Sequence, residues 1–117
     1  MELKPVIWIG SSLDDLRTFP EDIQDDLGYS LYRAQTGEFS EKAKRMQGNL
    51  RDVVELVATD SAGTFRLIYT VKLGDVVYVL HAFKKKAKHG IATPQNEIEL
   101  IARRLRLARM LHENQDD

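Results

Sequence analysis

FRLIYTVKLGDVVYVLHAF, residues 65–83, carries two apolar, β-branched runs on either side of a Gly74-Asp75 pair. Such runs around a short glycine-containing turn predict an antiparallel β-hairpin. The second run, residues 76–80, is apolar on both of its faces, which is typical of a central strand covered on both sides. The hairpin therefore predicts the middle of a sheet that other elements cover on its two faces.

The register of the hairpin predicts which side chains lie together. With the glycine–aspartate pair as the loop, Arg66 lies opposite Phe83. Two positions along, Ile68 lies opposite His81, so Arg66 and His81 share one face, although a slip of one residue would separate them. Burying an arginine without a partner is costly, so Arg66 either pairs with a carboxylate, such as that of Glu55, or faces a cleft. The hairpin alone favours the pairing and leaves the cleft open.

The sequence on either side of the hairpin predicts helices at both ends of the chain. Apolar residues recur every four positions between 19 and 31, which predicts an amphipathic helix from Pro20 to about Gln35. Thr93-Pro94 predicts the start of a last helix, with Thr93 as its N-cap. The other predicted elements are a strand at 6–9, a short helix from 12 to about 19, a polar loop at 38–49 and a strand at 50–58. The predicted fold is α+β, with two N-terminal helices packed on a mainly antiparallel four-stranded sheet and a C-terminal helix.

The overall composition indicates a small globular protein. The chain has 117 residues, of which 43% are hydrophobic and 30% charged, and we expect residues 1–117 to form a single domain with a flexible tail at 113–117. No apolar run reaches the roughly 20 residues of a membrane helix, and the first residues lack the pattern of a secretion signal. The absence of cysteine excludes disulfides and thiolate metal sites. We therefore expect a cytoplasmic protein that is not inserted in a membrane.

Charge is segregated along the chain behind a net value of −1. Residues 1–41 hold three basic and nine acidic side chains, whereas residues 42–112 hold fourteen basic and six acidic ones. Asymmetry of this kind suggests a face that binds a polyanion, although a solvated surface explains it as well.

A dense cationic cluster follows the second strand of the hairpin: Lys84, Lys85, Lys86 and Lys88, with His89 beside them. Lysine ammonium groups suit the phosphates of a nucleic-acid backbone. A solubilising loop is the alternative, but the mutual repulsion of four like charges at the end of an apolar strand favours anion binding. Because an unperturbed imidazole titrates near neutral pH, His81 and His89 are each candidates for proton transfer.

The last helix is apolar on two sides. Its main stripe consists of Ile98, Ile101, Leu105 and Ala108. Leu100, Leu107 and Leu111 lie on nearly the opposite side of the helix. A helix of this kind is either buried between layers or covered by a partner chain, and the sequence leaves both interpretations open.

Several segments, taken in order, resemble one toxin family. They are Leu50-Arg51 with Val54-Glu55-Leu56, then Phe65 to Tyr69, then Val79 to Lys86, then Thr93-Pro94 and a helix with Ile98, Arg103 and Leu105. Together they resemble the phage-derived, HigB-like branch of the RelE/ParE toxin superfamily over nearly the whole chain. The resemblance implies a RelE-like form of the α+β fold.

The resemblance also implies an activity and partners. Toxins of the RelE and HigB kind cut mRNA, typically on the ribosome, without a metal or other cofactor. Each is held inactive in a hetero-oligomer with an antitoxin that is often a helix-turn-helix protein. Arg66 and Lys85 match family positions that stabilise charge on the scissile phosphate, and His89 is the preferred group for proton transfer. The implied substrate-binding residues are Lys84, Lys86, Lys88, His81 and Tyr69, the last of which suits packing better, and the implied antitoxin-binding residues are Leu100, Leu107 and Leu111.

Departures from the family pattern leave alternatives open. Glu55 and Leu56 stand where RelE has lysines implicated in proton transfer, Ile91 stands near the position of a RelE tyrosine, and Ala87 replaces a serine common in this branch. The general acid and base are therefore open among His81, His89 and a lysine. Two other functions stay open, a ParE-like gyrase poison that is not a nuclease and an inactivated module that only binds its antitoxin. The retained Arg66 and the lysine cluster favour the nuclease.

Overall fold

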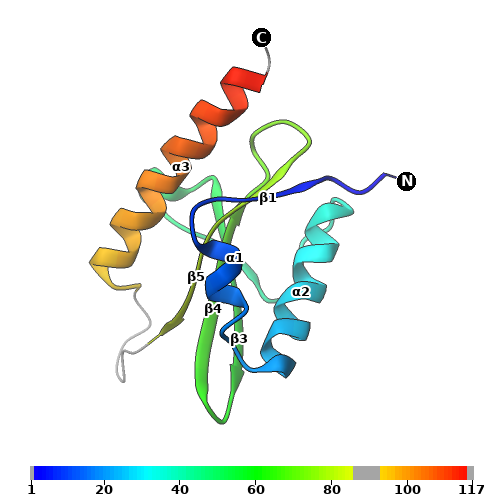
Figure 1. Cartoon of the computed structure of the whole chain (residues 1–117), viewed down its shortest axis with the longest axis vertical. Coiled ribbons are helices and arrows are strands. Elements are labelled where there is room, and N and C mark those ends of the chain that lie inside the picture. The colour runs from blue at the N-terminus through cyan, green and yellow to red at the C-terminus, as the bar shows by residue number, and fades with distance from the viewer. Residues whose placement is uncertain (1, 86–92, 116–117) are drawn as a thin grey trace.

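The computed structural model describes residues 2–85 and 93–115, and it has one sheet with helices on both faces (Figure 1). The elements are β1 (Val6–Trp8), α1 (Ser12–Leu16), α2 (Glu21–Gln35), β2 (Ala43–Arg45), the 3-10 helix η1 (Gly48–Leu50), β3 (Val53–Asp60), β4 (Gly63–Thr70), β5 (Val77–Lys85) and α3 (Gln95–Gln115). The predicted α+β class with a C-terminal helix is confirmed. Within the described part of the chain, no helix is both long enough and apolar enough to span a bilayer.

The sheet has five strands in the order β1-β5-β4-β3-β2, rather than the four predicted. β3, β4 and β5 pair antiparallel, and β2 extends the β3 edge in the same way. β1 pairs with β5 in parallel, beginning with Val6 opposite Val77. β2 lies inside the segment that the sequence predicts to be a loop. The strand was not predicted because its three residues, Ala43–Arg45, are too few and too polar to show the alternation of a strand.

The β4–β5 hairpin confirms part of the predicted register and corrects the rest. The two predicted pairs are present, namely Arg66 with Phe83 and Ile68 with His81. Past Ile68 the register shifts by one residue, which leaves Leu80 as an extra residue in β5. Because of this bulge, Leu80 packs in the core beneath α3 while the next residue, His81, also faces α3. The connection between the strands is residues 71–76 and not the two-residue turn that the sequence predicts.

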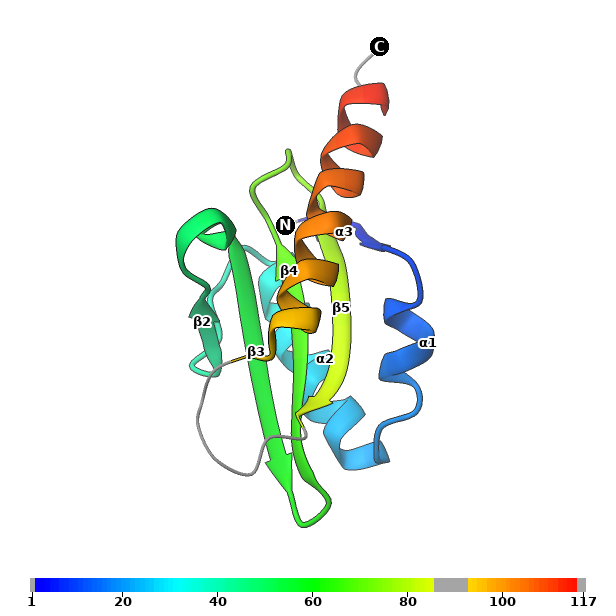
Figure 2. The same cartoon turned by 90° about the vertical axis from the view of Figure 1, so that its left-hand side faces the viewer.

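Two apolar cores lie on opposite faces of the sheet, one under α2 and one under α3 (Figure 2). The core under α2 includes Ile23, Leu27, Leu31, Leu56, Leu67 and Val79. The core under α3 includes Val53, Ile68, Leu80, Ile101, Leu105 and Ala108. The apolar stripes predicted for the two long helices are therefore the stripes that pack on the sheet.

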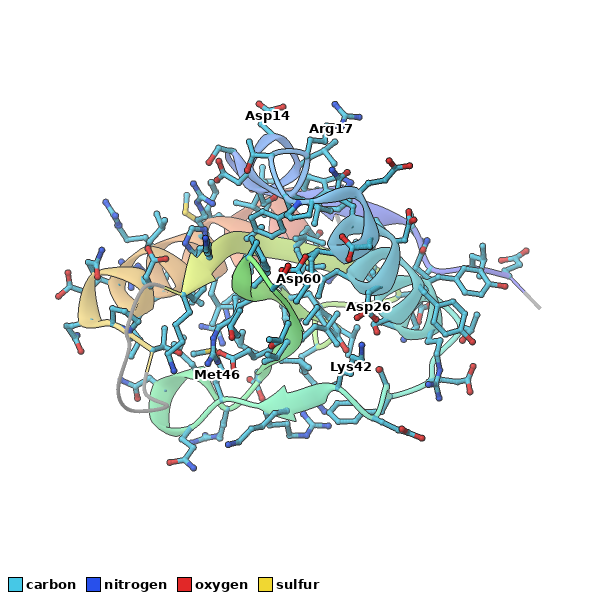
Figure 3. All side chains as sticks on the ribbon, turned by 90° about the horizontal axis from the view of Figure 1, so that it is seen from below. Asp14, Arg17, Asp26, Lys42, Met46 and Asp60 are labelled. Carbon is cyan, nitrogen blue, oxygen red and sulfur yellow. The ribbon has the colours of Figure 1, made fainter. Side chains whose placement is uncertain are left out.

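Smaller elements close the two edges of the sheet. Figure 3 looks from below, with α1, marked by Asp14 and Arg17, at one edge and Met46, just after β2, near the other. α1 ends at Leu16, earlier than the predicted end near residue 19. Lys42 forms an ion pair with Asp26 of α2, which ties the start of β2 to that helix.

α3 differs from its predicted bounds at both ends. The Pro94 carbonyl accepts hydrogen bonds from the amides of Glu97 and Ile98, both at 3.1 Å. Pro94 therefore occupies the N-cap position that the sequence assigns to Thr93. The helix continues to Gln115, so residues 113–115 of the predicted flexible tail are helical.

The C-terminal half of α3 extends beyond the end of the sheet (Figure 2). Leu107 and Leu111 are 43% and 40% exposed, Met110 beside them is 59% exposed, and Leu100 is half-buried. The interpretation that this second stripe is packed between layers is therefore wrong for Leu107 and Leu111. The remaining interpretation is that a partner chain covers this exposed stripe.

Candidate functional site

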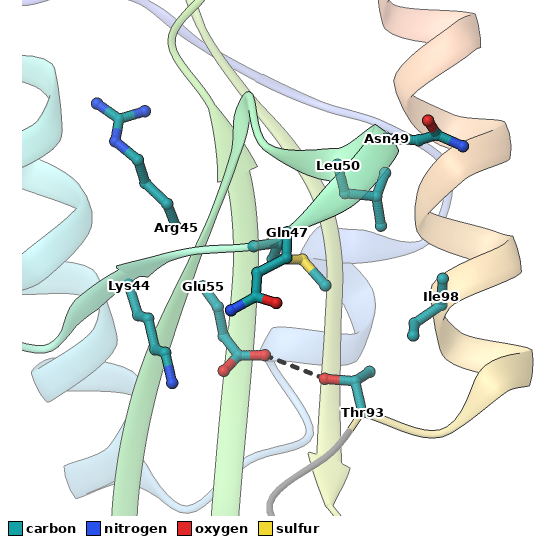
Figure 4. Close-up of a pocket in the computed structure, with 9 residues that line it drawn as sticks. Lys44, Arg45, Gln47, Asn49, Leu50, Glu55, Thr93 and Ile98 are labelled. Carbon is teal, nitrogen blue, oxygen red and sulfur yellow. Dashed lines mark hydrogen bonds between the residues drawn. The ribbon is translucent and has the colours of Figure 1, made fainter.

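A buried ion pair lies on the face of the sheet that α3 covers. Arg66 of β4 donates through Nη1 to Oε1 of Glu55 on β3, and the two side chains are 9% and 10% exposed. The pairing that the hairpin pattern favours is thus confirmed. The hydroxyl of Thr93 donates to the other carboxylate oxygen of Glu55 at 3.3 Å (Figure 4), which ties the pair to the start of α3.

The ion pair leaves part of the Arg66 guanidinium without a partner. Its Nε is buried and makes no hydrogen bond within residues 2–85 and 93–115. Buried donors are nearly always hydrogen-bonded, and an unpaired one calls for an explanation such as a ligand, an ion or a water molecule. Because a guanidinium presents planar pairs of donors, it can hold a carboxylate with one nitrogen and a phosphate with others.

His81 lies in the same layer but is enclosed by protein. Its Nε2 lies 3.3 Å from Glu97 Oε2, and its ring stacks on Phe83 with the centroids 4.9 Å apart. Burial lowers the pKa of His81 below its usual range, and the nearby Glu97 carboxylate opposes this shift. The residue is only 5% exposed. The ring is therefore enclosed by protein, and the expected role of His81 in substrate binding stays a prediction.

Arg104 of α3 fixes the bulged part of β5. Its Nη1 donates to the Leu80 carbonyl at 2.9 Å and lies 3.5 Å from His81 Nδ1, and its Nη2 donates to Ser11 Oγ at 3.0 Å. Gly10 has a φ of +57°, and a Cβ built there would lie 3.0 Å from the Arg104 guanidinium. Glycine at this turn therefore permits the guanidinium to reach β5.

The predicted lysine cluster does not lie on one face of the sheet. Lys84 is opposite Phe65 and its ammonium lies 5.7 Å from the centre of that ring, on the α2 side. The next residue, Lys85, is opposite Thr64 and alternation places it on the face of Arg66. Lys86, Lys88 and His89 lie outside the described residues. Of Lys84 and Lys85, only Lys85 lies on the same face of the sheet as Arg66. The prediction that Lys84 and Lys85 act together with Arg66 is corrected accordingly.

Tyr69 is a core residue. It is 1% exposed, packs in the core under α2, and has a pKa that burial raises above the usual value. Its interpretation as a packing residue is confirmed, and it lies on the opposite face of the sheet from Arg66.

A pocket of about 410 Å³ opens beside the ion pair (Figure 4). Its lining comes from β2, η1, β3 and the start of α3, and consists of Lys44, Arg45, Met46, Gln47, Asn49, Leu50, Glu55, Thr93 and Ile98. Lys44 lies directly opposite Glu55 in the β2–β3 register. Glu55 therefore belongs both to the wall of this pocket and to the ion pair with Arg66.

Comparison of the sequence with known protein families identifies the family of the chain. The profile of the family described as "Phage derived protein Gp49-like (DUF891)" matches residues 14–106. The chain belongs to this family. The matched span includes Glu55, Arg66 and His81 as well as the first half of α3, so the site of this Gp49-like protein lies within the part that defines the family.

Two solved structures share the fold of this Gp49-like protein at low sequence identity. One is a chain of the toxin–antitoxin complex RelBE2 from Mycobacterium tuberculosis, with a TM-score of 0.53, 18% identity, and coverage of 74% of this chain and 97% of that one. The other is the isolated RelE toxin of E. coli, with a TM-score of 0.53, 17% identity, and coverage of 86% and 97%. No curated protein matches the sequence. The family match confirms the predicted phage-derived family, and the two structures show that the chain has the predicted RelE-like fold.

Sequence patterns did not reveal the pocket of this Gp49-like protein. Lys44, Gln47 and Asn49 fall in the segment predicted as a loop, and Glu55 was expected only as a partner of Arg66. One signal was available, since Glu55 interrupts an otherwise apolar strand at an inward position. A buried carboxylate of this kind marks a site even where its neighbours are unknown.

Proposed function

We propose that this Gp49-like protein is the toxin of a toxin–antitoxin system and a metal-independent endoribonuclease that cleaves mRNA on the ribosome. The observation that carries the proposal is the buried guanidinium of Arg66, which has an unpaired donor and is held beside a carboxylate. Family membership and the RelE fold support the same activity.

In the proposed reaction the ribose 2′-hydroxyl attacks the adjacent phosphorus and the bond from phosphorus to O5′ breaks, leaving a 2′,3′-cyclic phosphate. The Glu55 carboxylate accepts the proton of the 2′-hydroxyl, and Arg66 binds the phosphate through the donors that Glu55 leaves unused. Lys85, on the same face, stabilises the charge that develops on the phosphate oxygens. His89 donates a proton to the leaving O5′. Such a site acts through positioning, proton transfer and charge stabilisation, and it requires no metal.

Glu55 is suited to the role of general base by its surroundings. The contact with Arg66 and the hydroxyl of Thr93 hold the carboxylate in one orientation, with one oxygen on each partner. In the proposed reaction the phosphate takes the Arg66 donors that Glu55 leaves unused, so the carboxylate keeps its orientation beside the substrate.

The activity is tested by inducing the chain in cells and mapping 5′ ends of mRNA on translating ribosomes. The wild-type chain should arrest growth and produce new 5′ ends. Glu55→Gln and Arg66→Lys should each reduce cleavage by about 10²-fold or more, because each removes a catalytic group while keeping a polar side chain of similar size. Thermal unfolding of each purified variant shows whether it is folded.

Lys72→Ala is the matched control, because Lys72 is an exposed lysine in the 71–76 connection, away from the ion pair. It should cleave at the wild-type rate. Unchanged cleavage by Glu55→Gln and Arg66→Lys would reject the site. Growth arrest with inhibited DNA supercoiling and intact mRNA would identify a gyrase poison instead, and antitoxin binding with neither effect would identify an inactivated module.

We also propose that the exposed side of α3 is the surface that binds the antitoxin, itself a helix-turn-helix protein. Leu107, Met110 and Leu111 form an exposed apolar stripe, and the exposed Arg103 and Arg106 flank it on the same helix. A basic and apolar helix face is complementary to an acidic, amphipathic segment. The proposed complex is therefore a hetero-oligomer in which Leu100, Leu107 and Leu111 lie under such a segment of the antitoxin.

Isothermal titration with the product of the adjacent gene tests this surface. Leu107→Glu combined with Leu111→Glu should weaken binding by at least about tenfold, since it places two charges within the apolar contact. Leu3→Glu is the control, because Leu3 is 48% exposed and lies at the opposite end of the chain. Equal affinities for the two variants would reject α3 as the docking surface.

A further inference from the structure

The pocket beside Glu55 combines the three kinds of surface that a nucleobase needs. Met46, Leu50 and Ile98 supply an apolar floor that is continuous with the core under α3. Gln47 and Asn49 supply two side-chain amides, each with donors and an acceptor. The volume of about 410 Å³ lies within the roughly 300–1,000 Å³ usual for small-molecule sites.

The amides of the pocket are available to a ligand. The Gln47 and Asn49 side chains are exposed, and neither makes a hydrogen bond to the part of the chain that the structure describes. In Figure 4 the Gln47 amide lies toward Glu55, whereas Asn49 lies on the side of α3. The lining of the pocket therefore includes one side-chain amide near Glu55 and one near α3.

The backbone that carries these amides is ordered by its own hydrogen bonds. The Met46 amide donates to the Val53 carbonyl at 2.9 Å, and the Leu50 amide donates to the Gln47 carbonyl at 3.1 Å. Gly48, between the two amide residues, has a φ of +62° that favours glycine. The positions of Gln47 and Asn49 are thus fixed by a short 3-10 turn, which favours selective recognition over adaptable binding.

Only one cation of β2 faces the pocket with its charged group. Lys44 alternates with Arg45 along β2, and the Arg45 guanidinium lies 5.5 Å from the centre of the Phe39 ring on the other side of the sheet. Figure 4 shows Arg45 directed away from the other lining side chains. Lys44 is therefore the lysine positioned to meet a phosphate at the edge of the pocket.

We infer that this pocket is a nucleobase subsite of the proposed nuclease, in which Gln47 and Asn49 read the edge of one base of single-stranded RNA next to the cleaved phosphate. The inference rests on the proposed function. Its geometric basis is Glu55, which contacts Arg66 through one carboxylate oxygen and also lines the pocket. Because the same Glu55 side chain contacts Arg66 and lines the pocket, a phosphate bound to Arg66 and a base in the pocket would lie on either side of Glu55. Unstacked bases held by apolar contacts and by amide hydrogen bonds are the usual targets of sequence-specific RNA recognition.

The first experiment compares cleavage sites. Wild-type protein and the double variant Gln47→Ala, Asn49→Ala are given a randomised mRNA on translating ribosomes, and the bases flanking each cut are counted. The wild type should prefer one base at one flanking position, and the double variant should lose about tenfold or more of that preference while it still cuts. Asn114→Ala, at an exposed amide near the end of α3, is the control and should keep the preference. An unchanged preference in the double variant would overturn the inference.

A second experiment does not depend on cleavage. The side-chain amide signals of Gln47 and Asn49 are followed by NMR while each of the four ribonucleoside 5′-monophosphates is added to the wild-type protein. At least one nucleotide should shift both amide signals, and the double variant should bind that nucleotide at least about tenfold more weakly. No shift with any of the four would overturn the subsite even if the protein cleaves mRNA. Shifts without cleavage would retain the subsite and reject the nuclease.

Discussion

The two faces of the sheet differ in what they bury. Under α2 the strands present apolar residues such as Leu56 and Leu67 and pack without an internal charge. Under α3 the same strands bury Glu55, Arg66 and His81 among apolar neighbours. Because a buried ion pair is often less stabilising than apolar residues of the same volume, stability alone does not account for the second face. The comparison shows that the buried charges of the described residues lie on the face that α3 covers, where the proposed site is.

Arg66→Ala should show the largest effect and most directly tests this difference. It should lower the free energy of unfolding by about 3–5 kcal/mol, because Glu55 would be left as an unpaired buried charge. The measurement is urea denaturation of the purified variant. The double variant Arg66→Met, Glu55→Leu should recover most of this loss but not the proposed cleavage, and a double variant as unstable as the single one would contradict the comparison.

Leu67→Ala applies a truncation of similar scale to the other face. Leu67 is fully buried under α2, and its truncation should cost about 2–5 kcal/mol through lost contacts and the cavity that remains. The rate of mRNA cleavage per folded molecule should be unchanged, since the ion pair lies on the opposite face. A loss of cleavage in protein shown to be folded would mean that the two faces are coupled.

The pH dependence of the free energy of unfolding should show a smaller effect, which arises from His81 on the face under α3. Because the pKa of His81 is lowered in the folded protein, the unfolded chain binds its proton first as the pH falls below about 6.5. The contribution of His81 to stability is therefore present above this pH and is lost as the pH decreases toward the folded pKa. Urea denaturation at pH 7.5 and 5.5 should show a steeper loss for the wild type than for His81→Gln. Equal slopes would show that the pKa of His81 is the same in the folded and the unfolded chain, contrary to this expectation.

Lys42→Ala should have the smallest effect. The ion pair with Asp26 joins side chains that are 45% and 34% exposed, so its removal should change the free energy of unfolding by at most about 1 kcal/mol. The same denaturation assay, repeated in high salt, should show no difference between variant and wild type. A loss as large as that of Arg66→Ala would contradict the distinction between buried and surface pairs in this molecule.

The sequence predicts the features that depend on the local alternation of side chains along a strand or helix. The alternation in β4 and β5 predicts both the Arg66–Phe83 pair and the shared face of Arg66 and His81, and the structure has both. Alternation also separates Lys84 from Lys85, a consequence that a count of nearby lysines overlooks. Local pattern could thus have corrected the lysine cluster without coordinates.

Features that depend on contacts between distant segments could not be predicted from local sequence patterns. The bulge at Leu80 is stabilised by Arg104, which follows in the last helix. Thr93 has the residue type of a helix cap, but its hydroxyl binds Glu55 on β3. β2 pairs with β3 through only three residues. Each of these contacts joins parts of the chain whose proximity no single segment encodes.

The parallel pairing of β1 with β5 has a consequence for synthesis. Val6 is made before its partner Val77, and Thr93, which binds Glu55, is made later still. Pairing between distant segments is slow and cannot begin before both exist. A growing chain therefore carries an open sheet edge until Val77 has been made, and an unfinished site until Thr93 has been made.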